Sequence, residues 1–177
     1  AIDAAIRAAY ADIRAGRFDA ADRTLAGAAR LAETDDAVHR VTCWQQFAVY
    51  ARQFADFREQ ALDAANAGGD YDVGQTRIAV IESTREKFVY KSSGTIKRVA
   101  RSAIPDPVVT AIVRTWFAND ERPGNYVFLG THYLARSKPD PDKARAAWSR
   151  AGQGGENVSN LEPLLKDPVI LEAVAGG

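Results

Sequence analysis

The hydrophobic periodicity of this chain changes twice, and this change constrains the fold more than any other feature. Apolar residues recur at helical intervals over residues 1–67, form short runs and alternations over 70–103, and return to helical intervals over 104–177. The middle segment is rich in β-branched residues, which favour strands. Because strands stand between two helical parts, we expect an α+β, mostly helical fold that forms a single compact domain over residues 1–177.

The longest helical pattern covers residues 37–66 and carries an aromatic stripe. At 3.6 residues per turn, a helix of this length is about 45 Å long. We expect it to be the spine of the fold, ended by Gly68 and Gly69, with its Trp44–Phe57 stripe covering one face of the sheet. Its large and small apolar residues recur every three or four positions: Trp44, Phe47, Tyr50, Ala51, Phe54, Phe57, Ala61 and Leu62.

The middle segment predicts a small sheet of three antiparallel strands, at about 76–83, 87–91 and 95–101. The first contains the apolar run Ile78–Ile81, which indicates a buried strand. The other two flank Ser92-Ser93-Gly94, a turn signal typical of a β-hairpin.

Capping residues predict where the other helices begin. We expect helices at about 2–15 and 20–32, separated by Gly16 and with Asp19 as the second N-cap. Three Asp-Pro pairs predict later helix starts, since Asp caps free amides and Pro tolerates the first helical position. The pairs are Asp106-Pro107, Asp140-Pro141 and Asp167-Pro168. Between the first and second pairs we expect a break at 119–124 and a helix at 126–137, and between the second and third a short helix at 161–166.

Two segments share a spacing of small and large apolar residues. The segment YVFLGTHY places four residues at intervals of three, one and three: Tyr126, Leu129, Gly130 and Tyr133. The segment ARAAWSRA follows, with Ala144, Trp148 and Ala151 at intervals of four and three. The same intervals separate Ala21, Leu25 and Ala28 near the start of the chain. Tyr126–Ala151 and Gly16–Ala28 therefore resemble the tetratricopeptide repeat, whose helices follow W-x-x-L-G-x-x-Y and A-x-x-x-F.

The resemblance implies helical hairpins and an interaction role, but no active site, because the matched positions pack in that family. The two segments are not contiguous, so two separate hairpins around an α+β centre are favoured over a solenoid, whose units must stack directly. The arrangement also resembles uncharacterised domains of large bacterial proteins.

Composition excludes several classes of protein. Lys+Arg and Asp+Glu number 23 each, so no overall field favours nucleic acid or an anionic membrane. Cys43 is the single cysteine, which excludes an intrachain disulfide and a cysteine-rich metal site. No apolar run approaches the ~20 residues of a membrane span. The chain lacks methionine and starts at Ala1, so we expect a processed chain or a fragment, either cytoplasmic or exported.

Two sets of polar residues could be interpreted as catalytic or metal-binding sites. His39 and Cys43 lie one helical turn apart, where they could bind a metal or form a thiolate–imidazole pair, but no nearby motif supplies a third ligand. Ser83, His132 and Asp140 could form a hydrolase-like set, although no nucleophile-elbow glycines surround Ser83. We favour core and capping roles for these residues, and expect no catalytic, cofactor-binding or metal-binding residues.

The hairpin segment 85–101 concentrates positive charge. Its six cations face Glu86 alone, and Phe88 and Tyr90 interleave with them, a pattern that could bind single-stranded nucleic acid. Lys and Arg on outer strands also protect sheet edges, so a solvated face is the alternative. The candidates for ligand or nucleic-acid contact are Lys87, Tyr90, Lys91, Lys97, Arg98, Arg101 and, outside the hairpin, His132; Arg85 is the sixth cation.

The sequence favours a non-catalytic protein-interaction or scaffolding module of a larger bacterial protein. Its partner would be another protein or another domain of the same chain, and we expect no cofactor. Two alternatives remain open: a small-ligand-binding or hydrolase-like domain, and single-stranded nucleic-acid binding through the hairpin.

Overall fold

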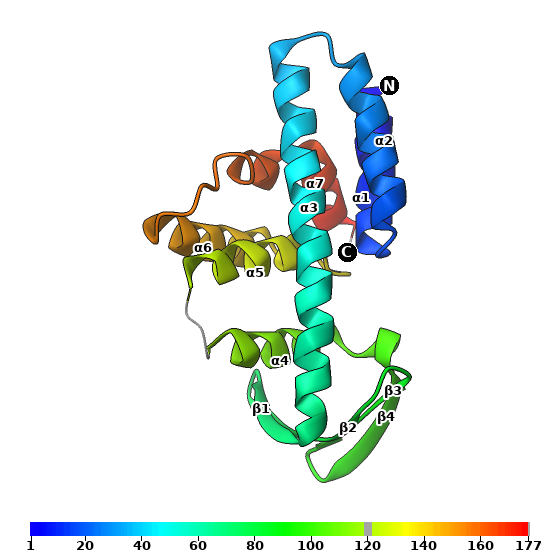
Figure 1. Cartoon of the computed structure of the whole chain (residues 1–177), viewed down its shortest axis with the longest axis vertical. Helices are drawn as coiled ribbons and strands as arrows, with labels where there is room; N and C mark the ends of the chain where they lie inside the picture. Colours follow the sequence, from blue (N-terminus) through cyan, green and yellow to red (C-terminus); the bar gives the residue numbers. More distant parts are fainter. Residues whose placement is uncertain (119–121, 177) are drawn as a thin grey trace. The chain divides into compact units, whose positions relative to one another are not determined.

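The computed structural model describes residues 1–118 and 122–176 and is of the α+β class (Figure 1). The described residues form seven α-helices: α1 (Ile2–Arg14), α2 (Phe18–Leu31), α3 (Asp35–Ala64), α4 (Asp106–Ala118), α5 (Pro123–Ala135), α6 (Pro141–Gln153) and α7 (Pro168–Ala175). Three 3₁₀ segments are η1 (Ala65–Ala67), η2 (Arg101–Ala103) and η3 (Glu162–Lys166). None of the described helices is long and apolar enough to cross a bilayer.

The residues group into two compact units. The first, called the helical unit below, comprises Ala1–Ala55 and Arg122–Gly177. The second, called the sheet unit, comprises Asp56–Glu121. Helix α3 contributes its N-terminal part to the first unit and its C-terminal part to the second. Two compact units that unfold together in one step would still form one cooperative domain. The expectation of a single domain over residues 1–177 therefore stays a prediction.

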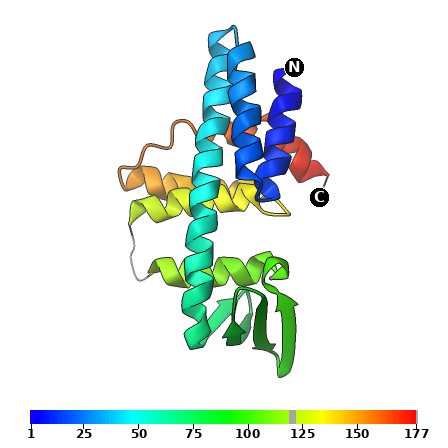
Figure 2. The same cartoon turned by 45° about the vertical axis from the view of Figure 1, so that its right-hand side comes forward.

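An aromatic cluster joins α1 to the N-terminal part of α3, and α1, α2 and this part of α3 lie side by side in both views (Figures 1 and 2). The ring of Trp44 stands edge-on to Tyr10, with centroids 5.3 Å apart, and to Phe47, at 5.5 Å. The Tyr10 hydroxyl donates to the carbonyl of Leu134 on α5 at 2.6 Å. Because all these groups are buried, the cluster ties the first helices to the α5–α6 pair.

Helices α5 and α6 pack closely because a glycine lies where they meet. A Cβ at Gly130 would overlap the indole Nε1 and Cδ1 of Trp148. That indole is fully buried and donates to the carbonyl of Val127 at 3.1 Å. The segment singled out in the sequence for its small and large apolar residues therefore forms a tight helix pair.

The aromatic stripe of α3 packs on helices, so the expectation that Trp44–Phe57 covers the sheet was wrong. Trp44 and Phe47 contact Tyr10, while Phe54 stacks on His132 of α5 at 4.5 Å. Phe57 packs on Phe117 of α4 at 5.8 Å. A helix of this length passes several elements in turn, and periodicity alone does not say which element meets each part of the stripe.

The sheet has four antiparallel strands, so the expected count of three was wrong. The strands are β1 (Gly69–Val73), β2 (Thr76–Ser83), β3 (Lys87–Ser92) and β4 (Thr95–Ala100), in the spatial order β1-β2-β3-β4. The three predicted strands are confirmed as β2, β3 and β4, and β1 is the addition. A bulge between Val80 and Glu82 shifts the β2–β3 register.

Two-residue turns close the outer hairpins of the sheet. The β3–β4 turn places Ser93 and Gly94 at φ of 48° and 81°, as a type I′ turn requires. The β1–β2 turn begins at Gly74, whose φ of 63° suits the first central position of a type II′ turn. These turns match the right-handed twist of the strands and fix the register of both hairpins.

Most predicted helix starts are confirmed. Asp140 and Asp167 accept hydrogen bonds from the amides of Lys143 and Val169 at 3.0 and 2.9 Å, and α4 begins at Asp106 itself. Asp19 as an N-cap was wrong: α2 starts two residues earlier than expected, at Phe18, and the Asp19 carboxylate instead accepts from Arg52 at 2.9 Å. The predicted break at 119–124 falls partly on 119–121, outside the described residues.

Candidate functional site

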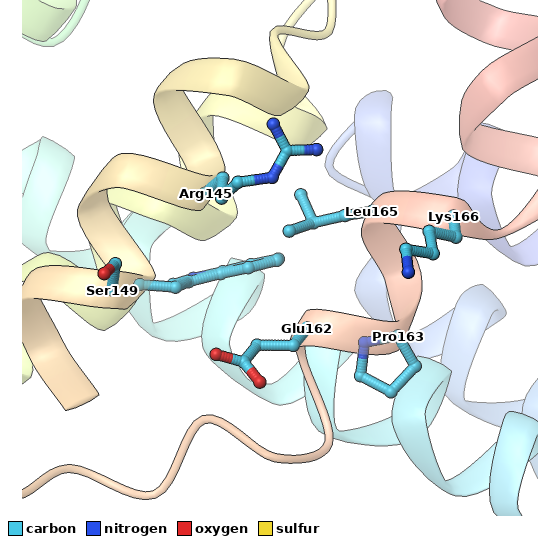
Figure 3. A pocket seen from close by; sticks show the side chains of 7 residues that line it. Arg145, Ser149, Glu162, Pro163, Leu165 and Lys166 are labelled. Atoms are coloured by element: carbon cyan, nitrogen blue, oxygen red, sulfur yellow. The ribbon is translucent and has the colours of Figure 1, made fainter.

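A groove of about 390 Å³ lies between α6 and η3 (Figure 3). Figure 3 shows Arg145 and Ser149 on α6 facing Glu162, Leu165 and Lys166 on η3. Such a volume suits a few side chains of a bound segment. The groove is lined by Arg145, Trp148, Ser149, Glu162, Pro163, Leu165 and Lys166.

The floor of the groove is apolar and fixed. Trp148 is held by its hydrogen bond to Val127 and by its contact with Gly130. Leu165 is also buried, whereas Pro163 is exposed at the rim. The buried Trp148 supports the groove from beneath, and a rigid support is useful for binding because little side-chain freedom is lost when a partner fills the groove.

The rim of the groove is charged and exposed. Arg145 donates to Asp142 at 2.8 Å, but both side chains remain largely in solvent, so this ion pair is weak. Lys166 has no ion pair among the described residues, and Glu162 is the single acidic residue of the lining. The rim therefore offers two cations and one carboxylate around an apolar floor.

Asp167 anchors the η3–α7 side of the groove. Its carboxylate accepts from Arg40 Nε at 2.8 Å and from Trp44 Nε1 at 3.1 Å, and it caps α7 through the Val169 amide. Burial acts to raise the pKa of Asp167, but these hydrogen bonds outweigh it, so the pKa lies below its ordinary value of 3.8. The buried, ionised carboxylate thus fastens the C-terminal segment to α3.

The basic hairpin separates most of its cations from its aromatic rings. Phe88 and Tyr90 point to the buried face of the sheet, and only 4% of Tyr90 is exposed. Lys87, on the opposite face, pairs with Glu82 at 3.1 Å. Lys97 shares the face of Tyr90, but the rings are buried there and offer little surface for stacking with a base. Lys91, Lys97 and Arg98 are exposed, without an ion pair among the described residues.

Arg101 is a structural residue of the sheet unit. Only 5% of it is exposed, and its guanidinium donates to Glu59 at 2.9 Å, to Asp63 at 2.7 Å and to the carbonyl of Thr84 at 2.9 Å. These bonds join the strand ends to the last turns of α3. The guanidinium is therefore occupied within the fold rather than presented to a ligand.

His132 is 7% exposed and lies in the helix core. Its ring stacks on Phe54 with an interplanar angle of 15° and lies 5.9 Å from the ring of Tyr133. Such aromatic stacking is a packing contact of the kind found in cores.

Ser83 and Asp140, the other members of the hydrolase-like set, have structural partners. The Ser83 hydroxyl donates to the carbonyl of Leu62 at 2.7 Å within the sheet unit. The Asp140 carboxylate caps α6 and accepts from Arg136 at 3.2 Å within the helical unit. Each group is engaged in holding its own local structure.

Cys43 and His39 approach each other on α3, with Sγ 3.7 Å from Nε2. Burial, and secondarily the charge of Asp167, raises the pKa of the Cys43 thiol, which disfavours the thiolate. Within 1–118 and 122–176, no group of three or more His, Cys, Asp or Glu side chains is arranged to hold a metal ion.

The sequence did not predict the groove. Trp148 was noted as a packing residue, but η3 returns to α6 only after an irregular stretch, and no local pattern encodes that return. The available signal was the amphipathic character of η3, whose Leu164 and Leu165 are buried beside exposed Glu162 and Lys166.

Comparisons of this chain with protein-family models, curated proteins and solved structures give no match.

Proposed function

We propose that this chain is a non-catalytic protein-interaction module that binds an extended peptide segment in the α6–η3 groove. The observation that carries the proposal is the combination of a rigid apolar floor, at Trp148 and Leu165, with an exposed charged rim. A partner segment gains affinity by filling the groove beside the exposed Pro163 and the exposed edge of Leu165, and gains specificity by pairing with the rim.

The charges of the rim favour a particular peptide chemistry. Lys166 and Arg145 outnumber Glu162, so the segment that fits best carries an apolar side chain beside a carboxylate. The segment belongs to another protein or to another domain of the parent chain, which we take to be bacterial.

The helical hairpins support this proposal. The close contact of Gly130 with Trp148 uses the residues in which the chain resembles the tetratricopeptide family, whose hairpins serve interactions. Trp148, which packs against Gly130 in the hairpin, also lines the groove, so scaffold and groove share this residue.

A random-peptide selection on the immobilised 177-residue chain tests the proposal. We expect enriched peptides to combine an acidic residue with a large apolar one, and to bind Lys166→Glu at least tenfold more weakly. The control Lys138→Glu reverses an exposed cation outside the groove lining and should leave binding unchanged. Peptides that bind both variants equally well would place the interaction elsewhere.

A further inference from the structure

The two edges of the four-stranded sheet carry opposite charge. Strand β1, one edge, has the exposed residues Asp70 and Asp72, whereas strand β4, the other edge, has the exposed residues Lys97 and Arg98. Neither edge pairs with a further strand among the described residues. Strand β1 also contacts helix α4, but Gly69, Asp70 and Asp72 remain exposed. Each edge therefore presents exposed residues, not paired with a further strand, beside charges of a single sign.

The registers place most of these charges on one face of the sheet. Asp70 lies opposite Ala79, which lies opposite Lys91, and Lys91 lies opposite Ile96. Directly opposed residues share a face, and alternate residues of a strand do too, so Asp70, Asp72, Ile96 and Arg98 lie on the same face. Lys97 lies on the other face, opposite Tyr90, yet remains exposed at the edge.

We propose that β4 of one copy of this chain pairs with β1 of a second copy, which extends the sheet from copy to copy. Strands β1 and β4 run in opposite directions, so two copies in the same orientation form an antiparallel ladder. The strand that pairs with the β4 edge thus belongs to a second copy, because the β1 edge of that copy carries the opposite charge.

Register strengthens the pairing of unlike edges. If Arg98 lies opposite Asp70 of the second copy, Ile96 lies opposite Asp72; if Arg98 lies opposite Asp72, Ala100 lies opposite Asp70. Both registers keep the two faces continuous and put Arg98 across from a carboxylate, as a favourable cross-strand pair. A shift by one residue would turn the side chains to the wrong face.

Pairing of like edges is disfavoured by the same charges. Two β4 edges would bring Lys97 and Arg98 against their own copies, and two β1 edges would oppose Asp70 and Asp72. The contact is therefore heterologous, and repetition gives open chains rather than a closed symmetric dimer. The salt bridge between Asp70 and Arg77, 3.4 Å long, leaves Asp72 as the less compensated carboxylate of its edge.

This inference does not rest on the proposed peptide groove. The edge residues belong to the Asp56–Glu121 unit and the groove residues to the other. A failure of either proposal leaves the other standing, because the variants of one do not touch the residues of the other.

Sedimentation velocity of the 177-residue chain tests the edge pairing. We expect the weight-average sedimentation coefficient to rise with protein concentration at low ionic strength, and to rise less when salt screens the charges. Lys97→Glu with Arg98→Glu should abolish the rise, and so should Asp70→Lys with Asp72→Lys. A mixture of these two double variants should associate again, because each unlike pair of edges is then complementary.

Controls keep the result specific. Lys138→Glu reverses an exposed cation of the other compact unit and should associate like the wild type. Circular dichroism verifies that each variant folds. If a double variant does not fold, the milder substitutions Arg98→Gln and Asp72→Asn replace it, and each should reduce the rise of the sedimentation coefficient with concentration. A monomer at every concentration in low salt, association that ignores the edge variants, or a mixture that stays monomeric would overturn the proposal.

Discussion

Phe54 is a buried residue of α3 that links this helix to α5. It is 6% exposed and its ring stacks on His132 at 4.5 Å. We expect Phe54→Ala to lower the free energy of unfolding by about 3–5 kcal/mol, since truncation removes the ring and leaves a cavity. Urea denaturation followed by far-UV circular dichroism measures the change.

The exposed Val49 on the same helix is the control for this substitution. Val49→Ala should change the free energy of unfolding by less than ~0.5 kcal/mol, because its side chain stands largely in solvent. A loss below about 1 kcal/mol for Phe54→Ala would show that the stack contributes little.

The Asp167 carboxylate gives the protein a defined response to acid. Its pKa in the folded state lies below the unfolded value of 3.8, so its contribution is complete above that value and is lost as pH falls through the folded pKa. We expect Asp167→Asn to cost about 2–3 kcal/mol at pH 7, since Arg40 then lacks its buried carboxylate.

Thermal melting between pH 7 and pH 3 checks the Asp167 prediction. The difference in stability between wild type and Asp167→Asn should shrink towards the acid end. Asp3→Asn removes only the exposed carboxylate that also contacts Arg40, and should have a much smaller effect. A difference that stays constant over the whole pH range would refute the ionised state of Asp167.

The α5–α6 hairpin, at the scale of elements, depends on the absence of a side chain at Gly130. A Cβ there would overlap the indole of Trp148, so Gly130→Ala should cost about 2–3 kcal/mol and perturb the near-ultraviolet circular dichroism of that ring. Gly27→Ala in α2 is the matched control, because a Cβ there meets nothing within 4 Å.

The matched control has its own expected sign. Gly27 lies inside α2, where alanine is the better helix former, so Gly27→Ala should raise stability by up to ~1 kcal/mol. Equal losses from the two glycine substitutions in a denaturant titration would contradict the close contact at Gly130.

Strand β1 shows what local patterns do and do not predict. Gly69–Val73 alternates Asp with Tyr71 and Val73, and its acidic residues depress the strand signal. The local sign of a hairpin was Gly74, the first central residue of the Gly74-Gln75 turn. The hairpin at Ser93-Gly94 was predicted because longer β-branched runs flank it.

The helices were predicted better than the contacts between them. Periodicity and the Asp140 and Asp167 caps located the helices, because these signals are local. Neither the stacking of Phe54 on His132 nor the return of η3 to α6 could be predicted, since both join residues distant in the sequence. The groove therefore emerges only from tertiary structure.

Helix α3 leads to a prediction for the whole molecule. Its 30 residues form one continuous helix that contributes to both compact units. Because unfolding either unit exposes part of this helix, we expect a single cooperative thermal transition. Differential scanning calorimetry should give equal calorimetric and van't Hoff enthalpies. Two resolved transitions would show that the units unfold independently.

The peptide groove is the central functional claim for the molecule, and isothermal titration calorimetry with a selected acidic–apolar peptide tests it most directly. The titration compares the wild-type chain with Arg145→Glu, Lys166→Glu and the control Lys138→Glu. We predict at least tenfold weaker binding, about 1.4 kcal/mol, for each groove variant and no change for the control. Equal affinity for all four proteins would contradict a binding site between α6 and η3.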